Sequence, residues 1–296
     1  FVGAWEPLSL QLARGIENDG AGSMSEDVQQ PGVRNRLRSR RPSTRLLETI
    51  GGEASERRTQ LPVPGQVVAD KYRIEGLIGR GGMGAVYSAA HLVSGKRVAV
   101  KWMLPAHRTA PDLADRFIRE ARATALIDHP NVVDIYDVGT ADGSVYLVME
   151  LLNGESLAQR LDRDPVTPTE AITLLMPALR AVTAAHAQGV IHRDLKPENI
   201  FLCTSPDGEP RELKVFDFGI SKIAADDLRD MALTVSGTVM GTPYYMSPEQ
   251  IRGLKNLDAR ADVYAFGVIL YEMLADCYPF DADTYNELIL KIATTA

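Results

Sequence analysis

One polar segment, IHRDLKPENIF at residues 191–201, holds the side chains with the clearest potential for chemistry. Asp194 and Asn199 stand five residues apart with Lys196 between them, and Pro197 disfavours regular structure there. A carboxylate, an amine and an amide therefore share one loop that lies between apolar residues. A solvated surface loop is the plainer alternative, but such a loop has no need of apolar flanks.

A second acidic residue could complete a metal site with this loop. Asp217 follows a short apolar strand in ELKVFDFGISK and precedes Gly219. Oxygen atoms of Asn199 and Asp217 suit Mg²⁺, which takes few protein ligands and keeps water and substrate oxygens. The pair therefore indicates a magnesium site that also takes phosphate oxygens.

The pattern G-x-G-x-x-G-x-V is formed by Gly79, Gly81, Gly84 and Val86. Glycines let backbone N–H groups approach phosphate oxygens, because no Cβ stands in the way. An ordinary hairpin turn is the alternative, and the pattern alone does not decide between them. A dinucleotide-binding fingerprint is excluded, since the following AVYSAAH continues as a strand and not as a helix.

Two charged residues downstream also allow a structural and a functional interpretation. Lys101 ends the apolar run VAVK, either as a protective lysine on an edge strand or as a cation held in a cleft. Glu120 stands among arginines on an expected helix, where local pairing is the plainer interpretation. Neither residue identifies the chemistry alone.

The elements that must position these residues change in type along the chain. Strand patterns come first, at 71–79, 85–91, 97–103, 132–139 and 144–151. Helical patterns occupy 112–127 and then, almost without interruption by strands, 167–189, 258–275 and 284–296. On the first helix the expected buried face comprises Leu113, Phe117, Ala121 and Leu126. Strands followed by helices predict an α+β protein with two unlike lobes.

Composition excludes several other classes of protein. Of the 296 residues, 45% are hydrophobic and 24% are charged, as in globular proteins. The net charge of −7 argues against nucleic acid as the main partner. Two cysteines, Cys203 and Cys277, are too few for a disulfide framework and favour the cytoplasm. The longest apolar stretch, 263–274, is too short to span a bilayer.

The first 60 residues differ from the rest. They hold nine arginines and eight acidic residues, and the run VRNRLRSRRPSTR has no sustained apolar period. Such a segment cannot bury enough surface to offset the entropy of ordering. We therefore expect a disordered Arg-rich tail at 1–65, with an arm that binds phosphates of membranes or nucleic acids as the alternative.

Taken together, the motifs resemble those of the protein kinases. In chain order these are GRGGMGAV, VAVK, a helical glutamate, HRDLKPEN, DFG, GTPYYMSPE and ADVYAFG. The resemblance runs from about Tyr72 to the last residue. It implies a bilobal kinase domain at 66–296, with a small β-rich N-lobe at 66–150 carrying one main helix and a larger helical C-lobe at 151–296. The C-lobe is expected to be truncated after the family's helix G, and the chain to be a piece of a longer protein.

The resemblance also implies a role for each matching polar residue. Asp194 would accept the proton of the substrate hydroxyl, and Lys196 would offset charge on the transferring γ-phosphoryl group. Asn199 and Asp217 would hold Mg²⁺, with Mn²⁺ as an alternative. Lys101 would hold the α- and β-phosphates of ATP while paired with Glu120.

ATP would be enclosed by two further groups of residues. The loop over its phosphates would comprise Ile78, Gly79, Arg80, Gly81, Gly82, Met83, Gly84, Ala85 and Val86. The adenine would contact Val86 and Ala99, with Met149 at the rear and Glu150 to Leu152 along the hinge. Asp262 would tie the catalytic loop from below. Thr124 is polar where the family's active spine is commonly apolar.

The residues of several motifs resemble those of bacterial serine/threonine kinases more than those of tyrosine kinases. Lys196 follows Asp194 by two residues, and GTPYYMSPE would dock peptide substrates, with Thr242 in contact with the catalytic loop. Candidate autophosphorylation sites lie between Asp217 and Glu249, namely Thr234, Ser236 and Thr238. Arg193 would pair with such a phosphate, although a constitutively ordered segment is the alternative.

The implied function is transfer of the ATP γ-phosphoryl group to Ser/Thr hydroxyls of proteins. A pseudokinase scaffold is the alternative, but its usual losses, in Lys, Asp or DFG, are not found in this sequence. Implied partners are protein substrates and a homodimer for autophosphorylation in trans, with no specific nucleic acid and with a membrane only through regions absent from this chain. Glu249 would pair with an arginine beyond the last residue, so it is expected to be partly buried and uncompensated.

Overall fold

The structure is a computed structural model that describes residues 61–81, 84–103, 111–218, 243–254 and 256–294. The chain divides into two units, Phe1–Gly51 and Gly52–Ala296, and all described residues belong to the second. The expected tail lies outside the described residues except for its end, where Pro62 is buried and Leu61 packs against the first sheet. The boundary between tail and domain stays a prediction.

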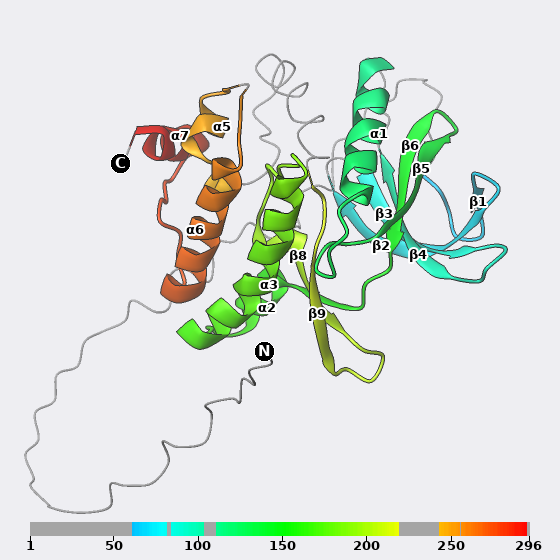
Figure 1. Cartoon of the computed structure of the whole chain (residues 1–296), viewed down its shortest axis with the longest axis horizontal. Helices are drawn as coiled ribbons and strands as arrows, with labels where there is room; N and C mark the ends of the chain where they lie inside the picture. The colour runs from blue at the N-terminus through cyan, green and yellow to red at the C-terminus, as the bar shows by residue number, and fades with distance from the viewer. Residues whose placement is uncertain (1–60, 82–83, 104–110, 219–242, 255, 295–296) are drawn as a thin grey trace, which may run out of the picture. The chain divides into compact units, whose positions relative to one another are not determined.

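The N-terminal lobe is one antiparallel sheet of six strands with a helix beside it (Figure 1). In spatial order the strands are β1 (Val67–Val68), β2 (Tyr72–Gly81), β3 (Gly84–His91), β4 (Arg97–Met103), β6 (Ser144–Glu150) and β5 (Ile135–Ala141). The helix is α1 (Pro111–Ala125). Consecutive strands from β1 to β4 pair with each other, as do β5 and β6, whereas α1 lies between β4 and β5. At the turn after β5, Asp142 and Gly143 both have positive φ, of 50° and 71°.

The C-terminal lobe combines a three-stranded antiparallel sheet with helices. Its strands are β7 (Gly154–Ser156), β8 (Ile200–Thr204) and β9 (Pro210–Val215). Its α-helices in the described residues are α2 (Leu157–Arg163), α3 (Pro168–Ala187), α5 (Pro248–Ile251), α6 (Arg260–Ala275) and α7 (Tyr285–Thr294). In the same part of the chain, 3₁₀ turns occupy Pro197–Asn199 and Pro243–Tyr245. No helix in the described residues is both long and apolar enough to cross a bilayer.

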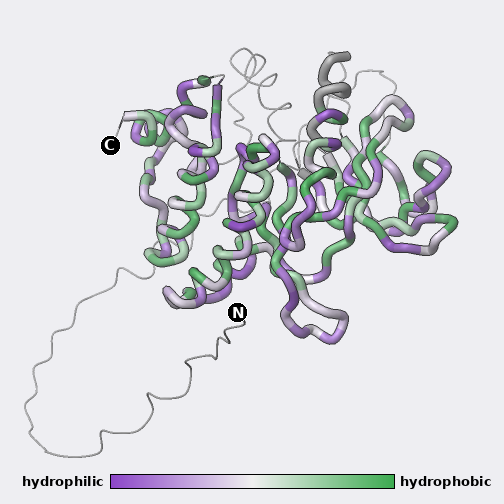
Figure 2. The backbone as a smooth tube through the Cα atoms, viewed as in Figure 1, coloured by the Kyte–Doolittle hydropathy of each residue, from purple (hydrophilic) through white to green (hydrophobic). Residues whose placement is uncertain are grey.

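The buried core explains why these segments fold as they do. In the C-terminal lobe, apolar faces of α3 and α6 pack with β8, β9 and Phe218, and green apolar stretches follow these elements in Figure 2. In the N-terminal lobe, Trp102 stacks on Tyr146 at 6.5 Å between ring centroids. Alternation of buried and partly buried residues along β3, from Ala85 to Ala90, matches the period of a strand. The predicted α+β fold with two unlike lobes is confirmed.

Three details differ from the sequence-based expectation. The helix expected to run to residue 127 ends at Ala125, and Leu126 is 74% exposed, not buried. A tight turn follows the helix, with Ile127 N donating to Thr124 O, and it buries Thr124 and Ile127 instead. Phe117 and Ala121 are buried as predicted, while the side chain of Leu113 lies outside the described residues.

The other two differences concern short elements. The strand expected from residue 132 begins at Ile135, because Val132 forms a bridge with Val215 of β9 in the other lobe. In this bridge Val133 N donates to Val215 O, and Val215 N donates to Asn131 O. Helix α2 was not predicted, since a helix of seven residues gives little periodicity. Its start is fixed by a capping box in which Ser156 and Gln159 bond reciprocally.

Candidate active site

The polar loop at 191–201 is held from α6 by the buried carboxylate of Asp262. Its two oxygens accept hydrogen bonds from the backbone N–H groups of His192, at 2.9 Å, and Arg193, at 2.8 Å. His186 at the end of α3 adds a third contact through Nε2, at 2.7 Å. The predicted tie between Asp262 and the catalytic loop is confirmed, and it holds Arg193 in a left-handed conformation with φ 65°.

His192 connects this loop to the segment that carries Asp217. It is fully buried, its Nε2 lies 3.0 Å from Phe216 O, and its ring packs on Phe218. Burial lowers the pKa of His192, and nearby carboxylates only partly oppose this effect. The neutral ring therefore carries its proton on Nε2 and accepts at Nδ1 from Asp194 N, at 3.4 Å.

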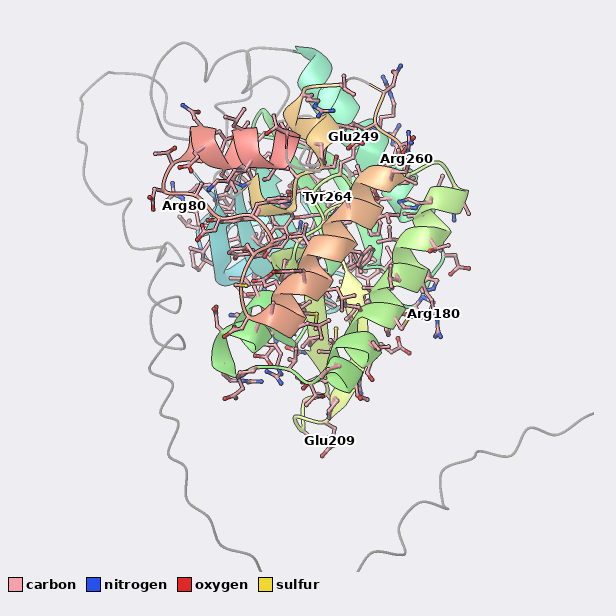
Figure 3. The ribbon with its side chains drawn as sticks, turned by 90° about the vertical axis from the view of Figure 1, so that its left-hand side faces the viewer. Arg80, Arg180, Glu209, Glu249, Arg260 and Tyr264 are labelled. Carbon is pink, nitrogen blue, oxygen red and sulfur yellow. The ribbon has the colours of Figure 1, made fainter. Side chains whose placement is uncertain are left out.

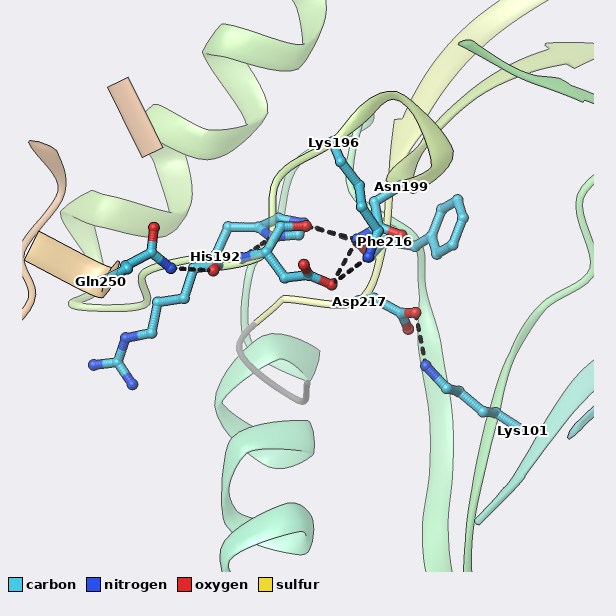
Figure 4. Close-up of polar contacts among 9 residues, drawn as sticks. Lys101, His192, Lys196, Asn199, Phe216, Asp217 and Gln250 are labelled. Atoms are coloured by element: carbon cyan, nitrogen blue, oxygen red, sulfur yellow. Dashed lines mark hydrogen bonds and ion pairs between the residues drawn. The ribbon is translucent and has the colours of Figure 1, made fainter. Parts of the chain in front are cut away.

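Asp194, Lys196 and Asn199 come together as a hydrogen-bonded group (Figure 4). Lys196 Nζ donates to Asp194 Oδ2 at 2.8 Å, and Asn199 Nδ2 donates to Asp194 O at 2.7 Å. Burial lowers the pKa of Lys196, but the Asp194 carboxylate outweighs it and the net pKa is raised. Lys196 thus stays charged beside the carboxylate.

Across from this group, Lys101 forms an ion pair with Asp217 at 2.6 Å. Lys101 lies on β4, which pairs with β3 on one side and β6 on the other, so the interpretation as an edge-strand lysine is wrong. Burial raises the pKa of Asp217, but the ammonium of Lys101 more than reverses this and holds it below its ordinary value. The carboxylate of Asp217 is therefore ionised beside the ammonium of Lys101.

The expected partner of Lys101 cannot be placed in the same way. Glu120 lies on α1, but its side chain is outside the described residues. Its pairing with Lys101 stays a prediction. The contact that the structure gives Lys101 is with Asp217, which has a left-handed backbone with φ 64°.

The residues expected around adenine belong to one apolar cluster at the boundary between the lobes. Ala99 and Met149 are buried opposite each other on β4 and β6, and Val86 and Leu152 pack against the same cluster. Glu150 begins the connection to the C-terminal lobe, and its carboxylate lies 3.1 Å from Lys214 of β9. The structure thus brings the apolar side chains expected around adenine into one cluster, and their contact with a nucleotide stays a prediction.

The glycine pattern lies on the β2–β3 hairpin, where Gly79, Arg80 and Gly81 pair with Val86, Ala85 and Gly84. Ile78 is 54% exposed and a Cβ on Gly79 would meet nothing within 4 Å. A glycine is needed at position 84 for a different reason, because a Cβ on Gly84 would collide with Trp102 O on β4. Gly82 and Met83 lie outside the described residues.

A divalent metal fits the oxygen atoms of Asn199 and Asp217. Because Nδ2 of Asn199 bonds to Asp194, its Oδ1 is the atom left to face a metal. Within the described residues there is no cluster of three or more His, Cys, Asp or Glu side chains suited to a metal. An amide and a carboxylate are oxygen donors that suit Mg²⁺ or Mn²⁺ shared with phosphate oxygens.

Three residues that contact this site were not found from the sequence. His186 binds Asp262, Lys214 binds Glu150, and Gln250 Nε2 donates to Arg193 O at 2.6 Å. For Gln250 a signal existed, since Ser247-Pro-Glu-Gln250 has the spacing of a capping box, but that spacing predicts only a helix start.

The regulatory residues fall mostly outside the structure. Thr234, Ser236, Thr238 and Thr242 lie outside the described residues. Arg193 Nε is buried and has no hydrogen-bond partner within the described part of the chain. The expectation that Glu249 is partly buried is wrong: Glu249 is exposed at the start of α5, close to Arg260 and Tyr264 of α6 (Figure 3).

Comparisons with known proteins agree with this geometry. The model of the family "Protein kinase domain" matches residues 72–295. Serine/threonine-protein kinase pkn3 of Myxococcus xanthus is 44% identical over 222 residues, which cover 74% of this chain and 40% of that protein. Probable serine/threonine-protein kinase PknB of Lactococcus lactis is 41% identical over 229 residues, covering 77% and 35%.

A solved structure is also similar. The kinase domain of PknI from Mycobacterium tuberculosis, crystallised as a double mutant, superposes with a TM-score of 0.60 at 25% identity. That match covers 75% of this chain and 79% of the other. Against the curated relatives the chain spans less than half of their length.

Proposed function

The chain belongs to the protein kinase family, and from that premise we propose that it transfers the γ-phosphoryl group of ATP to serine and threonine hydroxyls of proteins. The observation that carries the proposal is that two neighbouring groups of polar side chains are hydrogen-bonded: Asp194 with Lys196 and Asn199, and Asp217 with Lys101. Phosphoryl transfer requires positioning and compensation of charge more than covalent chemistry, and these groups supply both.

Asp194 is the residue for the substrate hydroxyl. Its Oδ2 accepts from Lys196 and, at 3.4 Å, from Asn199, and its main chain is fixed from both sides. A carboxylate held in this way can orient a hydroxyl and accept its proton as the oxygen attacks. Lys196 then remains beside the carboxylate to balance charge on the phosphoryl group.

Asn199 and Asp217 are proposed to hold Mg²⁺, and Lys101 to bind phosphate oxygens. A bound Mg²⁺ would neutralise phosphate charge and orient the γ-phosphoryl group. In the absence of nucleotide, Lys101 and Asp217 compensate each other's charge at 2.6 Å. Nucleotide and metal would offer each of them a new partner of opposite charge, so opening the ion pair leaves neither charge unpaired.

The adenine is proposed to lie against Ala99, Met149, Val86 and Leu152. Their shared apolar cluster supports this assignment, because a flat heterocycle gains most from apolar contact. Glu150 and Leu152 mark the chain connection between the lobes, where main-chain groups are available to the edge of the base. The exposed Ile78 and the open space at Gly79 support a hairpin that covers the phosphates.

Regulation by autophosphorylation of Thr234, Ser236 or Thr238 is part of the proposal. It is supported by Arg193 Nε, a buried donor without a partner in the described part of the chain, which a phosphate would satisfy. The proposal also places the reaction in the cytoplasm, where ATP is available and Cys203 and Cys277 stay reduced.

The test is transfer of radiolabel from γ-labelled ATP to a generic protein substrate in the presence of Mg²⁺. Asp194→Asn removes the proton acceptor and should lower kcat by on the order of 10²- to 10⁴-fold. Lys101→Met should also abolish labelling, since it removes the cation in the cleft. Asp207→Asn, on the exposed turn between β8 and β9, is the matched control and should keep wild-type activity.

Each result has a definite meaning. Labelling that persists in Asp194→Asn would contradict the role of Asp194. A wild-type chain that binds ATP but labels nothing would favour the pseudokinase alternative.

A further inference from the structure

Gln250 joins the segment that precedes α5 to the catalytic loop. Its side-chain amide bonds in two directions at once. Nε2 donates to Arg193 O at 2.6 Å (Figure 4), and Oε1 accepts from Ser247 N at 3.0 Å. Ser247 is fully buried, and its Oγ in turn accepts from Gln250 N at 3.4 Å. Only an amide can be acceptor and donor in this arrangement.

The bond to Arg193 acts on the peptide unit that leads into Asp194. A peptide unit is planar, so fixing Arg193 O also fixes the N–H and Cα of Asp194. The opposite side of Arg193 is held by Asp262, through Arg193 N at 2.8 Å. Arg193 has φ 65°. This conformation costs free energy, so it persists only where the surrounding contacts hold it.

Within the described residues, the other hydrogen bonds of the Asp194 main chain come from its own loop. Its N–H donates to His192 Nδ1 at 3.4 Å, which is a long bond, and its carbonyl accepts from Asn199. Of the contacts that orient the peptide unit before Asp194, the one to Gln250 is the shortest. It also comes from a different element, which follows the 3₁₀ turn at Pro243–Tyr245.

We infer that Gln250 is a positioning residue for the reaction: it orients Asp194 through the Arg193 carbonyl and couples that orientation to the segment 243–251. The inference rests on the proposed function and deepens it. Gln250 does not touch substrate or nucleotide in this role, so its loss should reduce kcat and leave binding of ATP unchanged.

The discriminating substitution is Gln250→Glu. A glutamate keeps the capping box with Ser247, but it replaces the N–H donor by an oxygen that faces the Arg193 carbonyl. The chain supplies a matched control in α2, because Gln159 makes the same capping box with Ser156, at 2.9 and 3.2 Å. Gln159 is exposed, and its side-chain amide bonds to Ser156 at the start of the same helix.

Four variants of the full chain separate positioning from folding: Gln250→Glu, Gln159→Glu, Gln250→Ala and Gln159→Ala. Gln250→Glu should melt close to wild type, keep its KM for ATP and lose roughly 10-fold or more in kcat. Gln159→Glu should match wild type in all three. The two alanine variants both lose a cap, so both lose stability, but only Gln250→Ala should lose kcat.

A second readout does not depend on activity. Hydrogen exchange at the backbone amides of residues 192–195 should be faster in Gln250→Glu than in Gln159→Glu or wild type. Wild-type kcat in Gln250→Glu with unchanged exchange would overturn the inference, as would a fall in kcat matched by Gln159→Glu. A wild type that transfers no phosphate would contradict the proposed function alone, and the exchange data would still decide whether Gln250 holds this loop.

Discussion

At the scale of single residues, the catalytic loop is organised by groups that need not touch substrate. Asp262 is 1% exposed and accepts from two backbone amides and from His186. Buried donors that lose water must find partners within the protein, and one carboxylate meets this need for two successive residues. The geometry of Asp194 therefore depends on α6, more than 60 residues further along the chain.

A pH dependence of stability follows from His192. Its folded pKa is lowered by burial from 6.5, so below about pH 6.5 the unfolded state binds more protons than the folded state. Above pH 6.5, His192 should therefore not lower the free energy of unfolding. Below pH 6.5, the free energy of unfolding should fall as the pH drops towards the folded pKa of His192. The slope from one histidine is at most about 1.4 kcal/mol per pH unit.

Urea unfolding at pH 7.5 and at pH 5.5 measures this effect. His192→Phe keeps a buried ring but cannot titrate, so its loss of stability between the two pH values should be smaller than in wild type. His91→Gln, at the end of β3, controls for removal of a histidine elsewhere. An equal pH dependence in His192→Phe and wild type would show that the buried histidine does not contribute.

At the scale of elements, the connection between α1 and β5 is shared by the two lobes. Val133 N donates to Val215 O at 3.0 Å, and Val215 N donates to Asn131 O at 2.8 Å. This segment thus extends the small sheet beside β9, the strand that leads to Asp217. Lys214 completes the junction by contacting both Glu150 and Val132 O.

Removing this lysine should cost stability because it leaves a carboxylate without its partner at the junction. The side chains of Lys214 and Glu150 are 12% and 30% exposed, so solvent screens the pair only in part. Lys214→Met should lower the free energy of unfolding by about 1–2 kcal/mol, and Glu150→Gln in the same chain should recover part of it. Chemical denaturation of the single and double variants gives the coupling.

The matched control is the ion pair between Arg163 and Glu155, whose side chains are 60% and 30% exposed. Arg163→Met should cost less than about 1 kcal/mol, since exposed pairs contribute little. Equal losses in Lys214→Met and Arg163→Met would indicate that the junction gains nothing from its charge pair.

At the scale of the whole molecule, the folded part begins before the first long strand. Leu61 packs against the N-terminal sheet, Gly65 N donates to Ile74 O at 2.8 Å, and Val68 in β1 is 2% exposed. The short β1 thus covers an edge of β2 that would otherwise expose backbone groups. Residues before Leu61 are predicted to add nothing to this packing.

Two truncations test this boundary. A chain lacking residues 1–60 should melt within about 2 °C of the full chain, because it keeps Leu61 and β1. A chain lacking residues 1–71 loses both, together with their hydrogen bonds to β2, and should melt at least about 5 °C lower. Differential scanning calorimetry measures both. A large loss in the shorter truncation would mean that the tail is part of the folded domain.

Much of the site could be predicted because its chemistry is encoded in short runs of sequence. The loop at 191–201 brings Asp194, Lys196 and Asn199 together by covalent proximity, with Pro197 shaping the turn. Strand periods likewise placed β2, β3, β4 and β6 to within about two residues. The predicted element boundaries were wrong where the partner of a residue is distant in sequence. Val132 has the pattern of a strand in its own lobe, but it forms a bridge with Val215 of β9.

The sequence by itself determined which residue types are available for the reaction and the local elements that carry them, since both depend on neighbours in the chain. Only the tertiary structure decided which of these groups meet. It placed Lys101 on a central strand, 116 residues from Asp217 in sequence and 2.6 Å away in space, and it aimed Gln250 at Arg193. The physical reason is that burial and long-range hydrogen bonds select one partner among many, and local periodicity contains no information about that choice.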